Sequence, residues 1–239
     1  MVVVPIWKRE IITRHLLNWY NDFDFQLVVV GSEGEKSRQL ANGLYLEAPN
    51  YPLDAKYDSG IQHCKLYNPD AVALVGSDDF ITGDYFEWAM SQISLGFDMV
   101  GLLDFYLADL TGNKIFYWGG YTGERSGDAI GAGRVYSKSI LDRLDWKPFG
   151  GPKGCYDHIF KDDERSEDMI RVAGGKIKSI NMANIGCRYW AVKTGNEINP
   201  IEAFHKAYNL VDITPNALDL MELDLKIEIN RTKSRYLLC

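Results

Sequence analysis

The chain has 239 residues and a formal net charge of -7, and 46% of its residues are hydrophobic while 25% are charged. This length and composition fit one large α/β domain of ordinary globular character, with or without a modest extension. The negative charge argues against a broad non-specific footprint on nucleic-acid backbone. No stretch approaches the roughly 18 apolar residues of a membrane span, and the N-terminus lacks the features of a signal peptide. The scattered cysteines are expected to be reduced, as in a cytoplasmic protein.

The first hundred residues alternate between apolar runs and amphipathic stretches. The apolar runs predict buried strands at residues 2–5, 26–30 and 71–75, and further strands at residues 44–47 and 99–103. The amphipathic stretches predict helices at residues 8–20, 54–67 and 84–94. Strands that alternate with helices predict an α/β fold with a Rossmann-like, mostly parallel central sheet flanked by helices.

After about residue 104 the pattern becomes irregular and rich in glycine. Strands are expected at residues 114–118, 176–182 and 187–192, and helices at residues 137–144, 165–173 and 200–208. We therefore expect a first half at 1–104, a second half of the same domain at 105–210, and a C-terminal tail at 211–239. The tail carries a leucine-rich helix and a basic end, and it can pack on the domain, form a homo-oligomer contact or fray.

The segment from Gly76 to Asp79 carries the clearest chemical pattern. It follows an expected buried strand, and in open α/β sheets ligands bind at the carboxyl ends of the strands. Two adjacent carboxylates, Asp78 and Asp79, repel each other unless positive charge lies nearby, and a divalent cation on a phosphate is a common solution. The alternative is that Ser77 and the two acids only cap the following helix.

Two stretches resemble the core of GT-A glycosyltransferases of the large family-two type, in its bacterial and phage forms. They are PLDAKYDSGI at residues 52–61 and YNPDAVALVGSDDFI at residues 67–81. Further motifs of that family are matched in order by VVVPIWKR, VVVGSE, IGAGRVYSK, YDHI and KTGNEINP, so that the resemblance covers roughly residues 1–208. The chain departs from the family at Trp7, at Glu33 and at Asp58, where an aromatic–Asn pair, an Asp and an Asn are usual.

The resemblance implies a GT-A fold and transfer of a sugar from a nucleotide-diphosphate donor, by default a UDP-sugar, to an acceptor hydroxyl, with inversion. Residues 1–104 would bind the nucleotide-sugar and residues 105–210 the acceptor, in the cytoplasm of a bacterium or a phage-infected host. Asp79 would hold Mn²⁺ or Mg²⁺ on the diphosphate, and His205 could complete its coordination, although its expected amphipathic helix also fits a structural role. The donor contacts implied are Pro5, Trp7, Arg9, Ser32, Glu33, Lys56 and Asp78.

The general base that removes the acceptor proton is implied to be Asp157. Glu167 and Asp168 are rivals, because they resemble the acidic pair that serves as base in many inverting enzymes. Acids near a helix start also stabilise the helix dipole, which is the structural alternative for this pair.

Aromatic side chains beside glycines can stack on a sugar or a nucleobase, and they can equally form a core cluster. The acceptor contacts expected are Trp118, Tyr121, Gly133, Arg134 and His158. The acceptor classes left open are a protein, a glycan, a small molecule and hydroxymethylated phage DNA. Two other functions remain open: a nucleotidyltransferase that makes a nucleotide-sugar, and a non-catalytic protein that binds nucleotide or carbohydrate.

Overall fold

The computed structural model describes residues 1–150, 162–195, 205, 209–230 and 235–238. The expectations for Asp157 and His158 and most of the helix expected at 200–208 lie outside these residues. Within them, no helix combines the length and the apolar character that crossing a bilayer requires.

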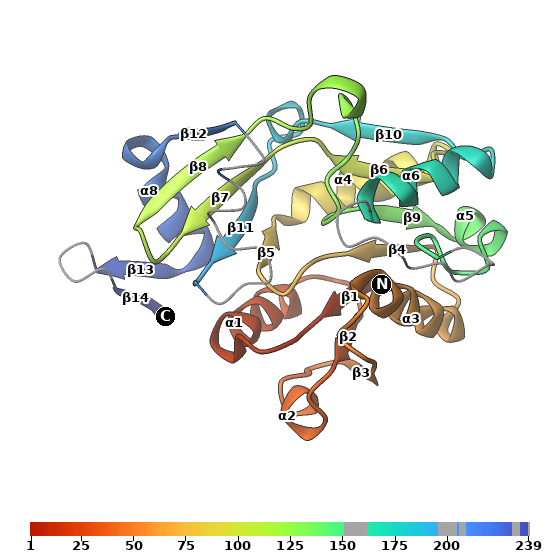
Figure 1. The fold of residues 1–239 in the computed structure, drawn as a ribbon, viewed down its shortest axis with the longest axis horizontal. Helices are drawn as coiled ribbons and strands as arrows, with labels where there is room; N and C mark the ends of the chain where they lie inside the picture. The colour runs from red at the N-terminus through yellow and green to blue at the C-terminus, as the bar shows by residue number, and fades with distance from the viewer. Residues whose placement is uncertain (151–161, 196–204, 206–208, 231–234, 239) are drawn as a thin grey trace.

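A seven-stranded sheet forms the centre of the fold (Figure 1), in the order β10-β6-β9-β4-β1-β2-β3. Every neighbouring pair is parallel except those that β9 makes with β4 and β6, which confirms the mostly parallel α/β sheet. The strands are β1 (Val2–Pro5), β2 (Leu27–Gly31), β3 (Leu44–Glu47), β4 (Ala71–Leu74), β6 (Met99–Leu102), β9 (Val135–Ser137) and β10 (Ile177–Ile180).

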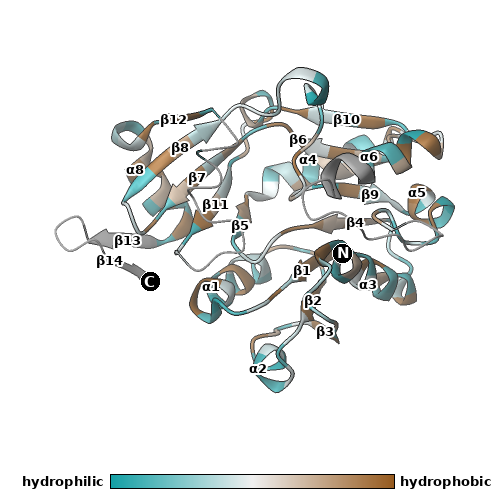
Figure 2. Cartoon of the chain, in the orientation of Figure 1, coloured by the Kyte–Doolittle hydropathy of each residue, from teal (hydrophilic) through white to brown (hydrophobic). Residues whose placement is uncertain are grey.

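Helices cover both faces of this sheet, so its central strands are apolar on both sides (Figure 2). Val2 and Val4 of β1 face the cluster that contains the buried residues of α1 (Glu10–Asn21) and α4 (Gly83–Ser94). Val3 faces the opposite cluster. That cluster holds buried residues of α3 (Leu53–Cys64), α5 (Lys138–Arg143) and α6 (Asp162–Val172).

A second, mixed sheet lies beside the first, in the order β12-β8-β7-β11-β5 (Figure 1). The chain passes from β4 into this sheet through the segment from Val75 to Asp78, because β5 begins at Asp79. The two acids therefore lie where the sheets meet. The strands are β5 (Asp79–Ile81), β7 (Phe105–Asp109), β8 (Lys114–Trp118), β11 (Tyr189–Lys193) and β12 (Leu210–Asp212).

The two sheets do not follow the expected division at residue 104. β9 and β10 come after that position and belong to the first sheet, whereas β5 comes before it and belongs to the second. The described part of the tail packs on the second sheet: β12 pairs with β8, and α8 (Thr214–Leu225) buries Ala217, Met221 and Leu225. The remaining elements are α2 (Glu35–Arg38), η1 (Lys65–Tyr67), η2 (Gly123–Arg125), η4 (Met182–Asn184) and the paired strands β13 (Ile227–Asn230) and β14 (Arg235–Leu238).

Candidate active site

The candidate site lies at the topological switch point of the first sheet. From β1 the chain adds β2 and β3 on one side, and β4 then pairs with β1 on the other side. Ligands of open α/β sheets bind where the strand order reverses, beyond the carboxyl ends of the strands. Here these ends lead into residues 6–9 after β1 and residues 75–79 after β4.

Asp78 is a buried carboxylate with two cationic partners. Nη1 of Arg9 and Nζ of Lys193 each lie 2.8 Å from its Oδ2 atom. Burial alone would raise the pKa of Asp78, but Lys193 and Arg9 outweigh that effect and lower it. Nη2 of Arg9 also donates to Oγ of Ser77, so this guanidinium is fixed by two neighbours. Asp78 is therefore ionised and electrostatically compensated.

Asp79 is buried beside Asp78, and no cationic side chain of the described chain forms an ion pair with it. Its Oδ1 atom accepts the hydroxyl of Tyr189 at 2.8 Å, and its Oδ2 atom accepts the main-chain N–H of Gly76 at 2.7 Å. Burial and the adjacent charge of Asp78 raise the pKa of Asp79 to about 6. A Cβ atom at Gly76 would lie 2.3 Å from Oδ2, so the close approach requires glycine.

The residues present fit one divalent cation at Asp79. Asp79 forms no ion pair with a cationic side chain of the described residues, and hard cations such as Mg²⁺ and Mn²⁺ take oxygen ligands. No group of three or more His, Cys, Asp or Glu side chains is arranged to hold a metal in the part of the chain that the structure describes. A cation at Asp79 would therefore need further oxygen ligands from a bound substrate, as a diphosphate provides.

The ammonium of Lys56 contacts the main chain directly after the end of β1. Its Nζ atom donates to the carbonyl of Ile6 at 2.7 Å and to Oδ1 of Asn50 at 3.1 Å. Burial lowers the pKa of Lys56 to about 8, and Glu47 and Glu33 partly oppose that shift. Lys56 therefore lies beside the segment that follows β1.

The other expected donor residues gather at the ends of β1 and β2. The main-chain N–H of Lys8 donates to Oε2 of Glu33 at 2.6 Å, and the hydroxyl of Ser32 donates to the carbonyl of Ala48 at 2.7 Å. The ammonium of Lys8 lies 4.0 Å from the ring of Trp7. Pro5 ends β1 opposite Val30 of β2. Ser32 and Glu33 thus already bond to main-chain groups, and these bonds hold the segments that follow β1 and β2 in place.

Asp58 stands where the related family usually has Asn, and its surroundings explain the acid. One carboxylate oxygen accepts the N–H of Phe149 at 3.2 Å, and the other accepts the N–H of Gly150 at 2.8 Å. An Asn side chain has one oxygen and could not accept both bonds at separate atoms. Asp58 therefore joins α3 to the loop that follows α5.

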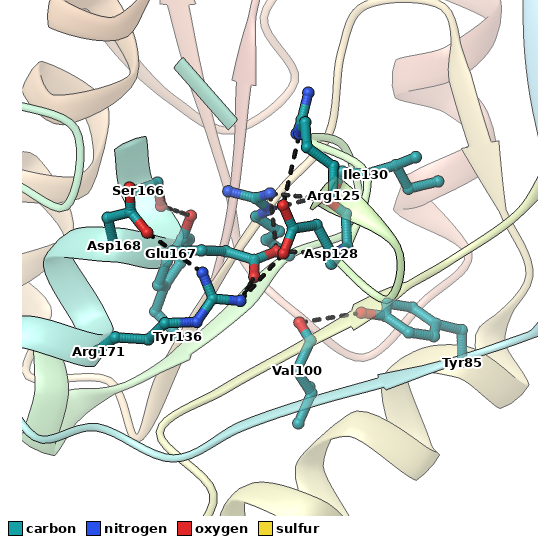
Figure 3. Close-up of polar contacts among 12 residues, drawn as sticks. Tyr85, Val100, Arg125, Asp128, Ile130, Tyr136, Ser166, Glu167, Asp168 and Arg171 are labelled. Atoms are coloured by element: carbon teal, nitrogen blue, oxygen red, sulfur yellow. Dashed lines mark hydrogen bonds and ion pairs between the residues drawn. The ribbon is translucent and has the colours of Figure 1, made fainter. Parts of the chain in front are cut away.

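Glu167 and Arg134 form a buried ion pair rather than parts of an open site. Both side chains are 0% exposed, and their charged atoms are 3.1 Å apart. Glu167 also accepts the N–H of Ala129 at 2.7 Å and pairs with Arg171 at 2.7 Å. Figure 3 shows Glu167 with Arg171, its second cationic partner. As placed, neither Glu167 nor Arg134 can touch an acceptor, which corrects our expectations of a base at Glu167 and an acceptor contact at Arg134. Asp168 is 63% exposed and lies 3.3 Å from Arg171.

The expected aromatic platform is largely a core cluster. Trp118 is buried and packs edge-on against Phe105 and Tyr121, with ring centroids 5.0 and 4.9 Å apart. Tyr121 is half-buried and carries the guanidinium of Arg125 at 3.6 Å from its ring centroid. Trp118 therefore matches the core alternative, whereas Tyr121 keeps some exposed surface. Gly133 has a φ of +83°, so its role in the structure is conformational.

His205 does not lie with Asp79. Its ring packs edge-on against Phe116, with centroids 4.7 Å apart. Phe116 is opposite Leu107, Leu107 is opposite Ala191, and Ala191 is opposite Asp79. Because neighbouring strands lie about 4.8 Å apart, Phe116 is about 14 Å from Asp79 across the sheet. This placement does not fit a shared metal and corrects that expectation.

Three residues without an expected role, Lys193, Tyr189 and Tyr20, also contact the acidic segment. The hydroxyl of Tyr20 donates to the carbonyl of Asp79 at 2.7 Å, and the other two contact the acidic side chains. Lys193 had two local signs, because it begins the KTGNEINP motif and ends an otherwise apolar strand.

Two solved structures have a similar fold at low sequence identity. One is residues 1–349 of S. aureus TarS, a glycosyltransferase, with a TM-score of 0.53, 16% identity, and coverage of 80% of this chain and 59% of that chain. The other is CMP:2-keto-3-deoxy-manno-octonic acid synthetase complexed with CTP, with a TM-score of 0.51 and 10% identity. The match covers 93% of this chain and 98% of that chain. This chain thus spans less than two thirds of the TarS structure.

No family model and no curated protein matches the sequence. Likeness at such low identity shows the fold and does not transfer the activity. Together with the mostly parallel sheet and its switch point, it establishes that the chain has a GT-A-like fold.

Proposed function

We propose that this protein is a metal-dependent glycosyltransferase, which moves a sugar from a nucleotide-diphosphate donor to an acceptor hydroxyl. The observation that carries the proposal is Asp79, a buried carboxylate at the switch point with a pKa raised to about 6 and no ion pair among the described residues. Such a group is suited to hold Mn²⁺ or Mg²⁺.

The charges around the acidic segment support the same proposal. Asp78 and Asp79 are balanced by Arg9 and Lys193, so the segment is close to neutral when both acids are ionised. A nucleotide-diphosphate sugar brings the negative charge of its two phosphates, which one divalent cation balances. A metal and a diphosphate that bind together therefore leave no large net charge buried.

Each group at the site has a defined task in this proposal. Asp79 holds the cation, which when bound supplies positive charge to the oxygens of the leaving diphosphate. Asp78 contacts the donor ribose or sugar, and Lys56 and Arg9 hold the donor in place. Asp157 takes the proton of the acceptor hydroxyl, and a single displacement inverts the anomeric carbon.

A nucleotidyltransferase is the second candidate function. Similarity to a synthetase complexed with CTP over 93% of this chain favours it. Against it, residues 5–9 after the first strand contain no glycine, whereas these enzymes usually carry a glycine-rich, basic phosphate loop there.

One experiment separates the two functions. The protein is incubated with UDP- and GDP-linked sugars, and separately with nucleoside triphosphates and sugar phosphates, with Mn²⁺ or with a chelator. Metal-dependent release of a nucleoside diphosphate supports the glycosyltransferase, and release of pyrophosphate supports the rival. Asp79→Asn should abolish the metal-dependent release, while Asp84→Asn, a change at an exposed acid, should not. Absence of both products would argue for a non-catalytic binding protein.

The acceptor is proposed by class only: a protein, a glycan, a small molecule or hydroxymethylated DNA. Incubation of the active donor with each class, followed by mass spectrometry, would identify which one gains the sugar mass.

A further inference from the structure

Lys193 reaches the acidic segment from the second sheet. Its Nζ atom lies 2.8 Å from Oδ2 of Asp78, and the residue is 7% exposed. Arg9 reaches the same oxygen at 2.8 Å from the end of β1. One carboxylate therefore has two cationic partners, and Asp78 stays compensated if one of them turns to a ligand.

The two cations differ in their chemistry. The guanidinium of Arg9 is fixed by Asp78 and by Ser77, and Arg9 itself has a left-handed φ of 51° at the start of α1. Lys193 has an ammonium with three donors on a flexible four-carbon stem, which can turn from one anion to another at small cost. Because Arg9 also pairs with Asp78, an exchange of Asp78 for a ligand anion by Lys193 leaves that carboxylate compensated.

Lys193 also lies on the face of β11, and at the end of that strand, from which its side chain can reach the acidic segment. Ala191 is directly opposite Asp79 in the pairing of β11 with β5. Lys193 follows two residues later, so its side chain projects from the same face, about 7 Å further along the strand. Its ammonium at Asp78 is therefore next to the carboxylate to which we assign the metal.

We propose that Lys193 is a further catalytic residue, which binds the donor diphosphate and neutralises it as it leaves; this inference rests on the proposed glycosyltransferase function. In the transfer, the bond between the anomeric carbon and the diphosphate oxygen breaks, and its electron pair stays on that oxygen. A bond forms from the acceptor oxygen to the anomeric carbon, and the acceptor proton passes to the base. The departing diphosphate gains one negative charge, which the positive ammonium of Lys193 stabilises.

Binding measurements test this role without relying on turnover. Calorimetry with Mn²⁺ compares the wild type, Lys193→Met and Lys193→Arg with UDP, GDP and CDP and with the matching nucleosides. Lys114→Met is the matched control, because Lys114 is an exposed strand lysine paired with Asp212 at 3.7 Å. Thermal unfolding confirms that each variant is folded.

Lys193→Met should weaken binding of the preferred diphosphate roughly 10- to 100-fold, as expected for a lost charge-assisted hydrogen bond. Its binding of the matching nucleoside should stay within about twofold of wild type, Lys193→Arg should restore much of the diphosphate affinity, and Lys114→Met should match wild type.

Unchanged diphosphate affinity in Lys193→Met, or an equal loss for diphosphate and nucleoside, would overturn the role of Lys193 and leave the proposed function standing. A wild type that binds none of the three diphosphates would overturn the proposed function, and this inference with it.

Discussion

The hydroxyl of Tyr189 donates to Oδ1 of Asp79 at 2.8 Å, and this bond joins β11 of the second sheet to the switch point of the first. Burial and the nearby charge of Asp79 raise the pKa of Tyr189 well above its usual value of 10.0, so the phenol remains a donor. The second sheet therefore orients the carboxylate to which we assign the metal.

Tyr189→Phe should lower Mn²⁺ affinity roughly 10- to 100-fold, because partners that orient a metal ligand contribute about that much. It should also lower the free energy of unfolding by about 1–3 kcal/mol, since Oδ1 of Asp79 loses its donor. Tyr117→Phe is the matched control, because that hydroxyl donates to Asp104 at 2.7 Å, and Asp104 has no assigned role in the site. Mn²⁺ titration and urea unfolding of both variants test this, and equal Mn²⁺ affinities would contradict it.

The raised pKa of Asp79 predicts a pH-dependent metal site. Below a pH of about 6 a proton competes with the cation for this carboxylate. Mn²⁺ affinity should therefore rise by up to roughly tenfold per pH unit below that value and level off above it. Titrations between about pH 5 and about pH 7.5 measure this, and a flat profile would contradict the assignment.

The same shift has a consequence for the metal-free protein. A carboxyl whose pKa rises on folding stabilises the folded state most at low pH, and this contribution is lost as the pH rises from 3.8 to about 6. Asp79→Asn should remove that dependence, so the stability of the variant relative to wild type should increase across this range. Urea unfolding at several pH values, compared with Asp84→Asn, provides the measurement.

Much of the fold was predictable because its apolar runs are local features. β1, β3 and β8 have the expected bounds, since apolar and aromatic residues favour strands. β5 was missed because it has three residues, too few for a period, and begins with an acid.

The site was predictable only in part. Asp78 and Asp79 follow an apolar run, and that local pattern was enough to single them out. The contacts of Asp78 with Arg9 and Lys193 span 69 and 115 residues of sequence, and no local pattern encodes such pairings. Glu167 carries the acid-pair pattern of a base, yet its burial against Arg134 depends on how α6 packs.

Glu167→Gln should destabilise the protein by about 3–5 kcal/mol, because Arg134 would keep its buried charge and lose its ion pair with Glu167. Asp168→Asn changes the neighbouring acid at an exposed position and should shift the free energy of unfolding by less than about 0.5 kcal/mol. Denaturant unfolding of both variants tests the difference. Similar stabilities would mean that the pair contributes no more than a surface contact.

Asp157→Asn should abolish sugar transfer and leave nucleotide affinity unchanged, because a general base acts on the acceptor and not on the donor. Asp168→Asn is the informative comparison, since Asp168 is the rival base that the structure leaves exposed. Calorimetry with the preferred diphosphate and a transfer assay are performed on both variants. Near-normal turnover in Asp157→Asn, together with loss of turnover in Asp168→Asn, would move the base from Asp157 to Asp168. Loss in Asp157→Asn alone would support Asp157, and it would leave Asp168 a surface residue paired with Arg171.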